Sequence, residues 1–463
     1  MSKKKPLSPI GQFQHRISIV AKKLVTKLKT WRSPNRKHNR SKNIIKKQYL
    51  LASIVVLIIS IAAYALLNTR EKPNITLNER NSISSQPNTK LNQPTPRSNQ
   101  PINQPSSSSA YNYTTQKPPI VPEWAKKNSE FKPPVHQSKW DNNGEISYYP
   151  DRQLLLKPSD KLTAIVKNVT KLIKNKKLND NNLSITLIDA TNGEIGEYQK
   201  DKLMFPASIA KMFWLVALQG QIKANMWNNP EAFDPFIDKM MKESDNDSSS
   251  FIIDNITGSY SSNEKFDDKI LEGWLKNRQF RINEYFKAAL YNPNINITQK
   301  TYPIPYLNLP EPKGNELQIR TNITNPDRPI RNSVSSFDAA RLMYEICYKK
   351  EAVSQTASNK ICSLLERQVD RKQWSKIKLE DFNPIQSFFG ESLPSRNIKF
   401  YSKAGWTPKS RSEVCMVTML DRKKSYILAV FADDPSFGKD KTIFPAISKL
   451  VFSEINRTGA RKS

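Results

Sequence analysis

The feature that most constrains the fold of this chain is an uncharged apolar run of eighteen residues, Leu50–Leu67 (LLASIVVLIISIAAYALL). This is near the lower length at which a helix crosses the roughly 30 Å hydrocarbon core of a bilayer. A buried core helix is the alternative, but Lys46 and Lys47 lie just before the run, at the end of a basic tail over residues 1–49. By the positive-inside rule we expect the tail to be cytoplasmic and everything after Leu67 to be exported.

A cleavable signal peptide is the weaker interpretation of the same run. Ala63-Tyr64-Ala65 resembles a signal-peptidase site, but the basic lead of nearly fifty residues is too long for such a peptide. We therefore expect residues 50–67 to be an uncleaved, single-pass membrane anchor.

The net charge of +31 raises nucleic-acid binding as a function, but its distribution weakens that interpretation. Residues 1–49 hold fifteen Lys and Arg and no acidic residue, which leaves +16 (31 − 15) for the remainder. A helical stripe in the tail, with lysines spread around it, suits an anionic membrane surface. A disordered solubilising tail is the main alternative, and we expect no nucleic-acid partner. The stripe consists of Ile17, Val20, Leu24, Val25, Leu28 and Trp31.

Residues 68–135 are rich in Asn, Gln, Ser, Thr and Pro, as in NQPTPRSNQPINQPSSSS. So few apolar residues cannot offset the entropy lost on ordering. We predict a disordered, flexible stalk between the anchor and the folded domain.

The usage of histidine and cysteine excludes several kinds of catalytic site. The only three histidines, His15, His38 and His136, precede the folded domain, so neither a Ser–His–Asp triad nor a histidine-bound catalytic zinc is possible there. The cysteines, Cys347, Cys362 and Cys415, have no metal-ligand spacing. A Cys347–Cys362 bridge is possible outside the cytoplasm, although three buried free thiols are the simpler expectation. We expect no metal and no cofactor.

Regular patterns resume near Lys157. Leu162, Ile165, Val166, Val169, Leu172 and Ile173 follow a helical period, and Leu183–Asp189 alternates like a strand before the Asn192-Gly193 turn. The return strand is predicted at Glu194–Tyr198, helices at about 207–222, 235–255 and 335–348, strands at Glu413–Leu420 and Tyr426–Phe431, and a last helix at about 445–456. This order predicts an α/β (α+β) fold, an antiparallel sheet with a helical insertion.

The first candidate catalytic motif is Phe205–Met212, FPASIAKM. Pro206 precedes a helical run, so Ser208 lies near a helix N-terminus, with Lys211 on the same face. An amine with a lowered pKa can take the serine proton, and the helix N-terminus favours the negative charge that develops on the adduct. Ser-x-x-Lys also occurs at Ser2, Ser129, Ser262, Ser375 and Ser436, and alone it is a weak signal.

Two further motifs support the assignment. Ser244-Asp245-Asn246 could be only a helix cap, but Ser244 could relay a proton to a leaving nitrogen and Asn246 could hold a substrate amide, with Asp245 structural. Tyr401–Trp406 (YSKAGW) falls where a strand is expected, and a surface turn is the alternative. There Lys403 would bind a substrate carboxylate and Gly405 would allow close approach of a ligand. The Trp406 N–H could complete an oxyanion hole with that of Ser208.

In this order the three motifs resemble the Ser-x-x-Lys, Ser-Asp-Asn and Lys-Thr-Gly set of class A β-lactamases and penicillin-binding proteins. The resemblance covers residues 157–457. It implies a five-stranded antiparallel sheet, covered by helices, beside an all-helical subdomain, with the site between them. It also implies a bacterial protein whose monomeric catalytic domain is periplasmic, and whose substrate is a β-lactam or a peptidoglycan peptide.

Two departures from the family pattern bear on activity. Ala404 stands where the family usually has Thr or Ser. The family's Ω-loop glutamate, which activates the deacylating water, has no carboxylate counterpart in either stretch that could correspond to it. One alignment places Ile304 there (IPYLN) and the other Asn322, while Glu311 and Glu316 lie nearby. We therefore expect a β-lactam-reactive serine hydrolase with slow deacylation. A peptidoglycan D,D-carboxypeptidase or transpeptidase, or a non-catalytic wall-binding protein, are the alternatives.

Overall fold

The structure is a computed structural model that describes residues 120–127, 131–136, 152–322, 325, 328–378 and 381–457. The basic tail, the apolar run Leu50–Leu67 and most of the predicted stalk lie outside these residues. Within the described ranges, none of the helices is both long enough and apolar enough to cross a membrane.

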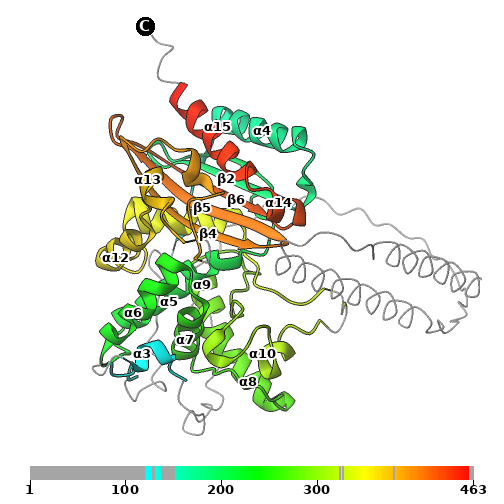
Figure 1. Cartoon of the computed structure of the whole chain (residues 1–463), viewed down its shortest axis with the longest axis vertical. Coiled ribbons are helices and arrows are strands. Elements are labelled where there is room, and N and C mark those ends of the chain that lie inside the picture. Colours follow the sequence, from blue (N-terminus) through cyan, green and yellow to red (C-terminus); the bar gives the residue numbers. More distant parts are fainter. Residues whose placement is uncertain are drawn as a thin grey trace, which may run out of the picture. The chain divides into compact units, whose positions relative to one another are not determined.

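A six-stranded sheet in the order β1-β3-β2-β6-β5-β4 forms the centre of the domain (Figure 1). Neighbouring strands are antiparallel, as predicted, except that β1 pairs with β3 in parallel. The predicted count of five strands was wrong, because a two-residue strand is too short to show any alternation. The strands are β1 (Lys157–Pro158), β2 (Leu183–Asp189), β3 (Glu194–Tyr198), β4 (Ile398–Thr407), β5 (Ser410–Met419) and β6 (Lys424–Ala432).

Two helices, α4 (Asp160–Asn175) and α15 (Ile443–Arg457), cover one face of the sheet, and Figure 1 shows them side by side. The predicted apolar stripe of α4 is the reason. Of its six residues, Leu162, Ile165, Val166, Val169 and Ile173 are buried, and they pack with β2 and β6 residues in one core cluster.

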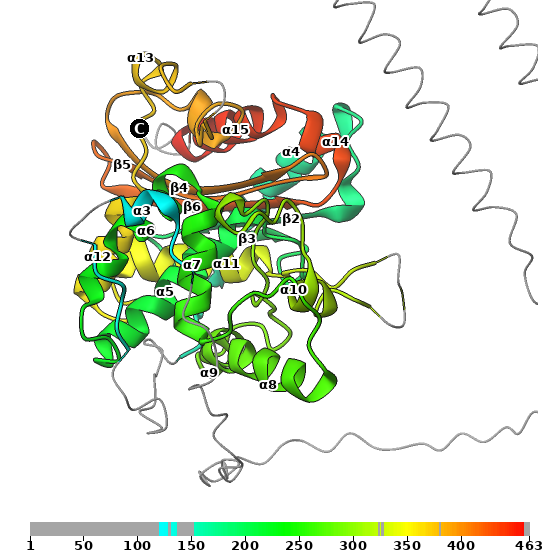
Figure 2. The ribbon, with the colours of Figure 1, turned by 60° about the horizontal axis from the view of Figure 1, so that its bottom comes forward.

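The other face carries the helical part of the domain, whose elements surround α5 in Figure 2. Its core contains a second apolar cluster built on α5, in which Met212, Phe213 and Trp214 are fully buried. The elements are η3 (Ala207–Ile209), α5 (Ala210–Lys223), η4 (Pro230–Phe233), α6 (Asp234–Asp238), η5 (Lys239–Glu243), α7 (Asn246–Thr257), α8 (Asp268–Arg278), η6 (Gln279–Glu284), α9 (Tyr285–Ala288), η7 (Pro305–Leu307), α10 (Gly314–Gln318), α11 (Ser336–Met343), η8 (Tyr344–Lys349) and α12 (Gln355–Leu365).

A disulfide joins Cys347 in η8 to Cys362 in α12, whereas Cys415 is a buried free thiol. The expectation of three free thiols was therefore wrong for two of them. The two elements pack against each other and bring the cysteine Cα atoms to 5.2 Å, inside the range that a disulfide requires.

The end of the predicted stalk is part of the folded domain, which corrects the prediction of disorder for that end. Residues 120–127 contain a short helix, α3 (Glu123–Lys126), and residues 131–136 follow it. Both pieces are held because the rings of Trp124 and Phe131 pack against Phe236.

Candidate active site

The predicted nucleophile, Ser208, lies in the short turn η3 that leads into α5. The residue before it, Ala207, has a φ of +46°, a left-handed conformation that costs energy for a residue other than glycine. Ser208 itself is half-buried. The prediction that it lies at the start of a helix is confirmed, with η3 added ahead of α5.

Gly405 in β4 packs directly on this turn. A methyl group at its Cα would lie 2.6 Å from the Pro206 carbonyl oxygen, 2.9 Å from the Ala207 Cβ and 3.0 Å from the Ser208 backbone nitrogen. Backbone atoms cannot move aside as a flexible side chain can. Only glycine therefore allows the strand to approach the turn this closely.

Lys211 is fully buried on the first turn of α5. Its Nζ donates to the Ser244 carbonyl oxygen and, at 2.8 Å, to Asn246 Oδ1, and it lies 3.4 Å from Ser244 Oγ. Burial lowers the pKa of Lys211 to about 7, against the opposing effect of Asp245. At neutral pH a large fraction of this amine is therefore uncharged and able to accept a proton.

The Ser-Asp-Asn segment forms the reversal between η5 and α7. Ser244 adopts the left-handed conformation (φ +59°, ψ +31°) at the end of η5. Asp245 caps α7, since its Oδ2 accepts from the Ser248 backbone N–H at 2.6 Å. The prediction that Asp245 is structural is thereby confirmed. The side chains of Ser244 and Asn246, which flank Asp245, both contact the Lys211 Nζ.

Lys403 reaches the same serine from the sheet. Its Nζ donates to Ser244 Oγ at 2.9 Å and to its neighbour's carbonyl, that of Ala404, at 3.3 Å. Burial, and then the positive charges of Lys211 and Arg367, hold the pKa of Lys403 well below its ordinary value. The structure thus brings Lys211, Ser244, Asn246 and Lys403 into one hydrogen-bonded group.

Arg367 is a residue that the sequence analysis missed. Its backbone N–H donates to the Phe400 carbonyl in β4 at 2.8 Å, and its guanidinium donates to the Met241 carbonyl in η5 at 2.7 Å. Burial lowers its pKa to about 10. It adds a third cation near Lys403, and no periodicity or motif in the sequence indicates it.

Trp406 is 46% exposed, and its indole N–H donates at 2.8 Å to the carbonyl of Gly438, in α14 (Pro435–Lys439). The indole is therefore engaged beside α14. An oxyanion role for this residue would have to come from its backbone N–H.

The two residues aligned with the family's Ω-loop glutamate lie on opposite sides of α10 in the sequence, Ile304 before it and Asn322 after it. Ile304 is buried and pairs with Leu309, while Asn322 is exposed and contacts Arg328. Another loop residue, Thr301, contacts the site, because its Oγ1 donates to Asn246 Oδ1 at 2.8 Å. The sequence analysis did not indicate Thr301.

Neither Glu311 nor Glu316, the two glutamates near the aligned stretches, is placed to act as a base. Glu311 is exposed. Glu316 is fully buried and bonds Arg278 at 2.6 Å, next to an Asp254–Lys300 pair at 2.6 Å. Burial alone would raise the pKa of Glu316. The positive charges of Arg278 and Lys300 outweigh this effect and hold that pKa below its usual range. Glu316 thus anchors the loop and is not a base for the site.

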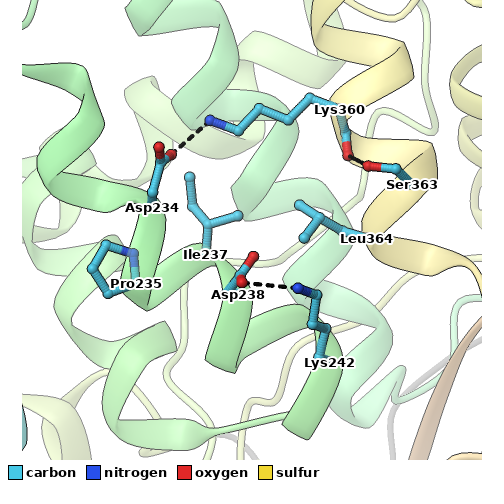
Figure 3. A pocket seen from close by; sticks show the side chains of 8 residues that line it. All are labelled: Asp234, Pro235, Ile237, Asp238, Lys242, Lys360, Ser363 and Leu364. Atoms are coloured by element: carbon cyan, nitrogen blue, oxygen red, sulfur yellow. Dashed lines mark hydrogen bonds and ion pairs between the residues drawn. The ribbon is translucent and has the colours of Figure 1, made fainter.

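A cleft of about 500 Å³ between α6 and α12 lies apart from these residues (Figure 3). Its apolar floor includes Ile237 and Leu364. Its charges pair with one another, Lys360 with Asp234 and Lys242 with Asp238. None of the predicted site residues lines it.

In the comparison with known proteins, part of the chain matches one family model. Residues 235–455 match the model described as the β-lactamase enzyme family, a span that includes Ser244, Asn246 and Lys403 but not Ser208. No curated protein matches the chain by sequence.

Solved structures resemble it only distantly. A β-lactamase from Sphaerobacter thermophilus is 14% identical (TM-score 0.43), with 64% of this chain and 99% of that one covered. A β-lactamase from Xanthomonas campestris is 10% identical (TM-score 0.42; 65% and 100% covered). A mutant PBP-A, in an acyl-enzyme complex with penicillin G, is 16% identical (TM-score 0.44; 65% and 98% covered). Likenesses this weak say nothing about the activity of this chain.

The contact between Gly405 and the nucleophile turn gives a testable prediction. Gly405→Ala should displace the Ser208 turn and reduce its reaction with a serine-directed acylating probe by roughly 100-fold, since a misplacement of about 1 Å has such an effect. Gly193→Asn is the control, because a Cβ added at Gly193 has no atom within 4 Å and Asn tolerates the positive φ (+67°) of that residue. Equal labelling of the two variants would show that the close approach does not matter.

Proposed function

We propose that the domain of this chain, whose residues 235–455 match the model of the β-lactamase enzyme family, is a serine acyl-enzyme with Ser208 as nucleophile. The single observation that carries this proposal is the buried amine of Lys211, one turn from Ser208, with its pKa brought to about 7. It gives the site a proton acceptor at neutral pH without a histidine.

In the acylation step the neutral Lys211 amine takes the Ser208 hydroxyl proton while Oγ attacks the carbonyl carbon of a β-lactam or peptide amide. The C–N bond then breaks, and the leaving nitrogen takes the proton of the Ser244 hydroxyl. The Lys211 ammonium, whose Nζ lies 3.4 Å from Ser244 Oγ, returns its proton to that oxygen, so both residues regain their starting protonation. Lys403 supports this relay because it donates to Ser244 Oγ and so leaves the serine proton free to depart. The backbone N–H groups of Ser208 and Trp406 would stabilise the oxyanion.

The positive charge of the site supports an anionic substrate. The carboxyl that acts on both Lys403 and Arg367 is Glu413, whose pKa burial raises to about 8, so it is mostly uncharged at neutral pH. A substrate carboxylate beside Lys403 would supply the missing negative charge. The Oδ1 of Asn246 already accepts hydrogen bonds from Lys211 and Thr301. Its amide NH2 group would therefore be the part that orients the substrate amide.

Deacylation is the step for which the described site offers no carboxylate base. The loop residue that reaches Asn246 is Thr301, whose hydroxyl cannot take a proton from water at neutral pH. We therefore infer a long-lived acyl-enzyme with β-lactams. The same observation favours a second function, that of a peptidoglycan D,D-carboxypeptidase or transpeptidase, for which a β-lactam is an inhibitor.

We also propose that the domain is held outside the cytoplasm by the anchor at residues 50–67. The disulfide between Cys347 and Cys362 supports an oxidising compartment, because such bonds persist mainly outside the cytosol. The charge asymmetry around Leu50–Leu67 supports the same orientation.

The acylation proposal predicts that a Ser208 variant forms no penicillin adduct and that the acylation rate depends on pH. Ser208→Ala should abolish the covalent mass gained with penicillin, measured by intact-mass spectrometry. In the unaltered chain the acylation rate should rise as pH passes through about 7, because Lys211 loses its proton there. An adduct on the Ser208→Ala variant, or a rate independent of pH from about 6 to 8.5, would falsify the assignment.

The deacylation proposal predicts burst kinetics. A chromogenic cephalosporin should give a burst near one equivalent and then a slow phase, because general-base assistance is typically worth about 10²–10⁴-fold. Thr301→Glu should speed the slow phase by placing a carboxylate beside Asn246. Asn322→Glu is the control, and it should leave the slow phase unchanged. Fast turnover without a burst by the unaltered chain would contradict the proposal.

The topology proposal predicts where protease acts on intact spheroplasts. Cleavage between Asn68 and Pro119 should release a fragment that still reacts with a fluorescent penicillin, because the described fold begins near Ile120. Release that requires a permeabilised membrane would instead place the domain in the cytoplasm.

A further inference from the structure

The residues that lead into the domain, 120–127 and 131–136, lie against its helical part; we call them the strap. Ala125 is buried, and the Trp124 ring lies 4.9 Å from that of Phe236 in α6. Phe131 meets the same ring edge-on at 5.7 Å. Lys239, the first residue of η5, places its Nζ 5.0 Å over Trp124.

The second part of the strap is fixed by backbone hydrogen bonds to the segment after α5. The Val135 N–H donates to Asn229 Oδ1 at 2.7 Å, and the Asn228 N–H donates to the Val135 carbonyl at 2.9 Å. The His136 ring contacts Trp227, whose indole N–H donates to Gln221 in α5. The strap is therefore held at both parts and not merely laid on the surface.

The strap covers the ring of Phe236, and this residue links the elements before and after the Ser244 turn. Phe236 is in α6, which continues without a break into η5 and ends at Ser244. Phe236 also stacks at 4.0 Å on Phe251, in the helix α7 that starts at Asn246. One aromatic side chain thus touches the element before the turn and the element after it.

The turn needs such support from outside. Ser244 is left-handed, and η5 before it is a π-helical segment, so neither is a low-energy local conformation. A strained turn keeps its geometry only where the surroundings fix it. Among the described ring contacts, those that cover Phe236 come from Phe251 and from the two strap residues, Trp124 and Phe131.

We propose that the strap is a positioning element of the catalytic site, and that Trp124 and Phe131, through Phe236, hold Ser244 and Asn246 against Lys211. This rests on the acyl-enzyme function proposed above. A segment that precedes the domain in the sequence thereby sets the geometry of the proton relay, although it contributes no group to the chemistry.

The test compares full-length variants below their melting temperatures, after circular dichroism shows that each is folded. Trp124→Ala and Phe131→Ala should lower the acylation rate with a fluorescent penicillin by roughly 10–100-fold at unchanged final stoichiometry. Trp124→Phe should restore most of the rate, because it keeps a ring over Phe236. The control is Lys360→Ala, which removes the 2.6 Å ion pair to Asp234 on the cleft side of α6 (Figure 3).

Two readouts separate positioning from general destabilisation. With looser packing, water should reach Lys211 and move the midpoint of the acylation profile above that of the unaltered chain, with Asp245 and Lys403 still the charged groups acting on it. Hydrogen exchange of residues 239–250 should rise in Trp124→Ala and not in Lys360→Ala.

The outcomes are distinct. Unchanged exchange in residues 239–250 together with an unchanged rate and midpoint in both alanine variants would overturn the strap proposal. If the unaltered chain is not acylated at all, the proposed function fails, and the exchange comparison alone still decides whether the strap fixes the turn.

Discussion

The burial of the Lys211 amine is the interaction on which the rest of the site depends. A buried amine without partners is costly, so its contacts with Asn246 Oδ1 and the Ser244 carbonyl are obligatory. These contacts tie α5 to the turn before α7, and Lys403 ties the sheet to the same serine. Three segments distant in sequence therefore meet at one hydroxyl group, and the lowered pKa that makes Lys211 a base follows from the same burial.

Much of this arrangement could be predicted from the sequence, because its parts carry local signals. The period of α4, the Asn192-Gly193 turn and the helix after Pro206 each follow from a few neighbouring residues. The spacing of Ser208 and Lys211 then fixes their relation, and the other two motifs supply Ser244 and Lys403. Arg367 could not be found in this way, since it is joined to β4 by a backbone hydrogen bond and to η5 by its guanidinium, contacts that depend on tertiary structure alone. The strand β1 could not be predicted either, because two residues are too few to show an alternating pattern.

The contact that the loop before α10 makes with the site could not be predicted for a related reason. Two stretches offered the expected Leu-Asn or helix spacing, but the path of the loop is set by buried charges. Glu316 is bound to Arg278, and Lys300 is bound to Asp254 in α7, so the backbone is held on both sides of Ile304. This brings Thr301, directly after Lys300, to Asn246. A carboxylate that pairs with a buried guanidinium stabilises the loop, and the same pairing removes it as a candidate base.

The electrostatics of the site bear differently on the two steps of the proposed reaction, acylation and deacylation. The carboxyl that acts on Lys403 is Glu413 in β5, whose pKa burial raises to about 8, so at neutral pH it is mostly uncharged and offsets little of the positive charge. Lys403, Arg367 and the protonated fraction of Lys211 thus repel one another. In the function proposed above, a substrate carboxylate would relieve that repulsion and bind beside Lys403. In the proposed acyl-enzyme, the same lack of a negative group leaves no carboxylate to draw a proton from water, so only the Lys211 amine could do so. A single property, positive charge around a buried amine, would therefore favour the first step of the proposed reaction and leave the second without a carboxylate base.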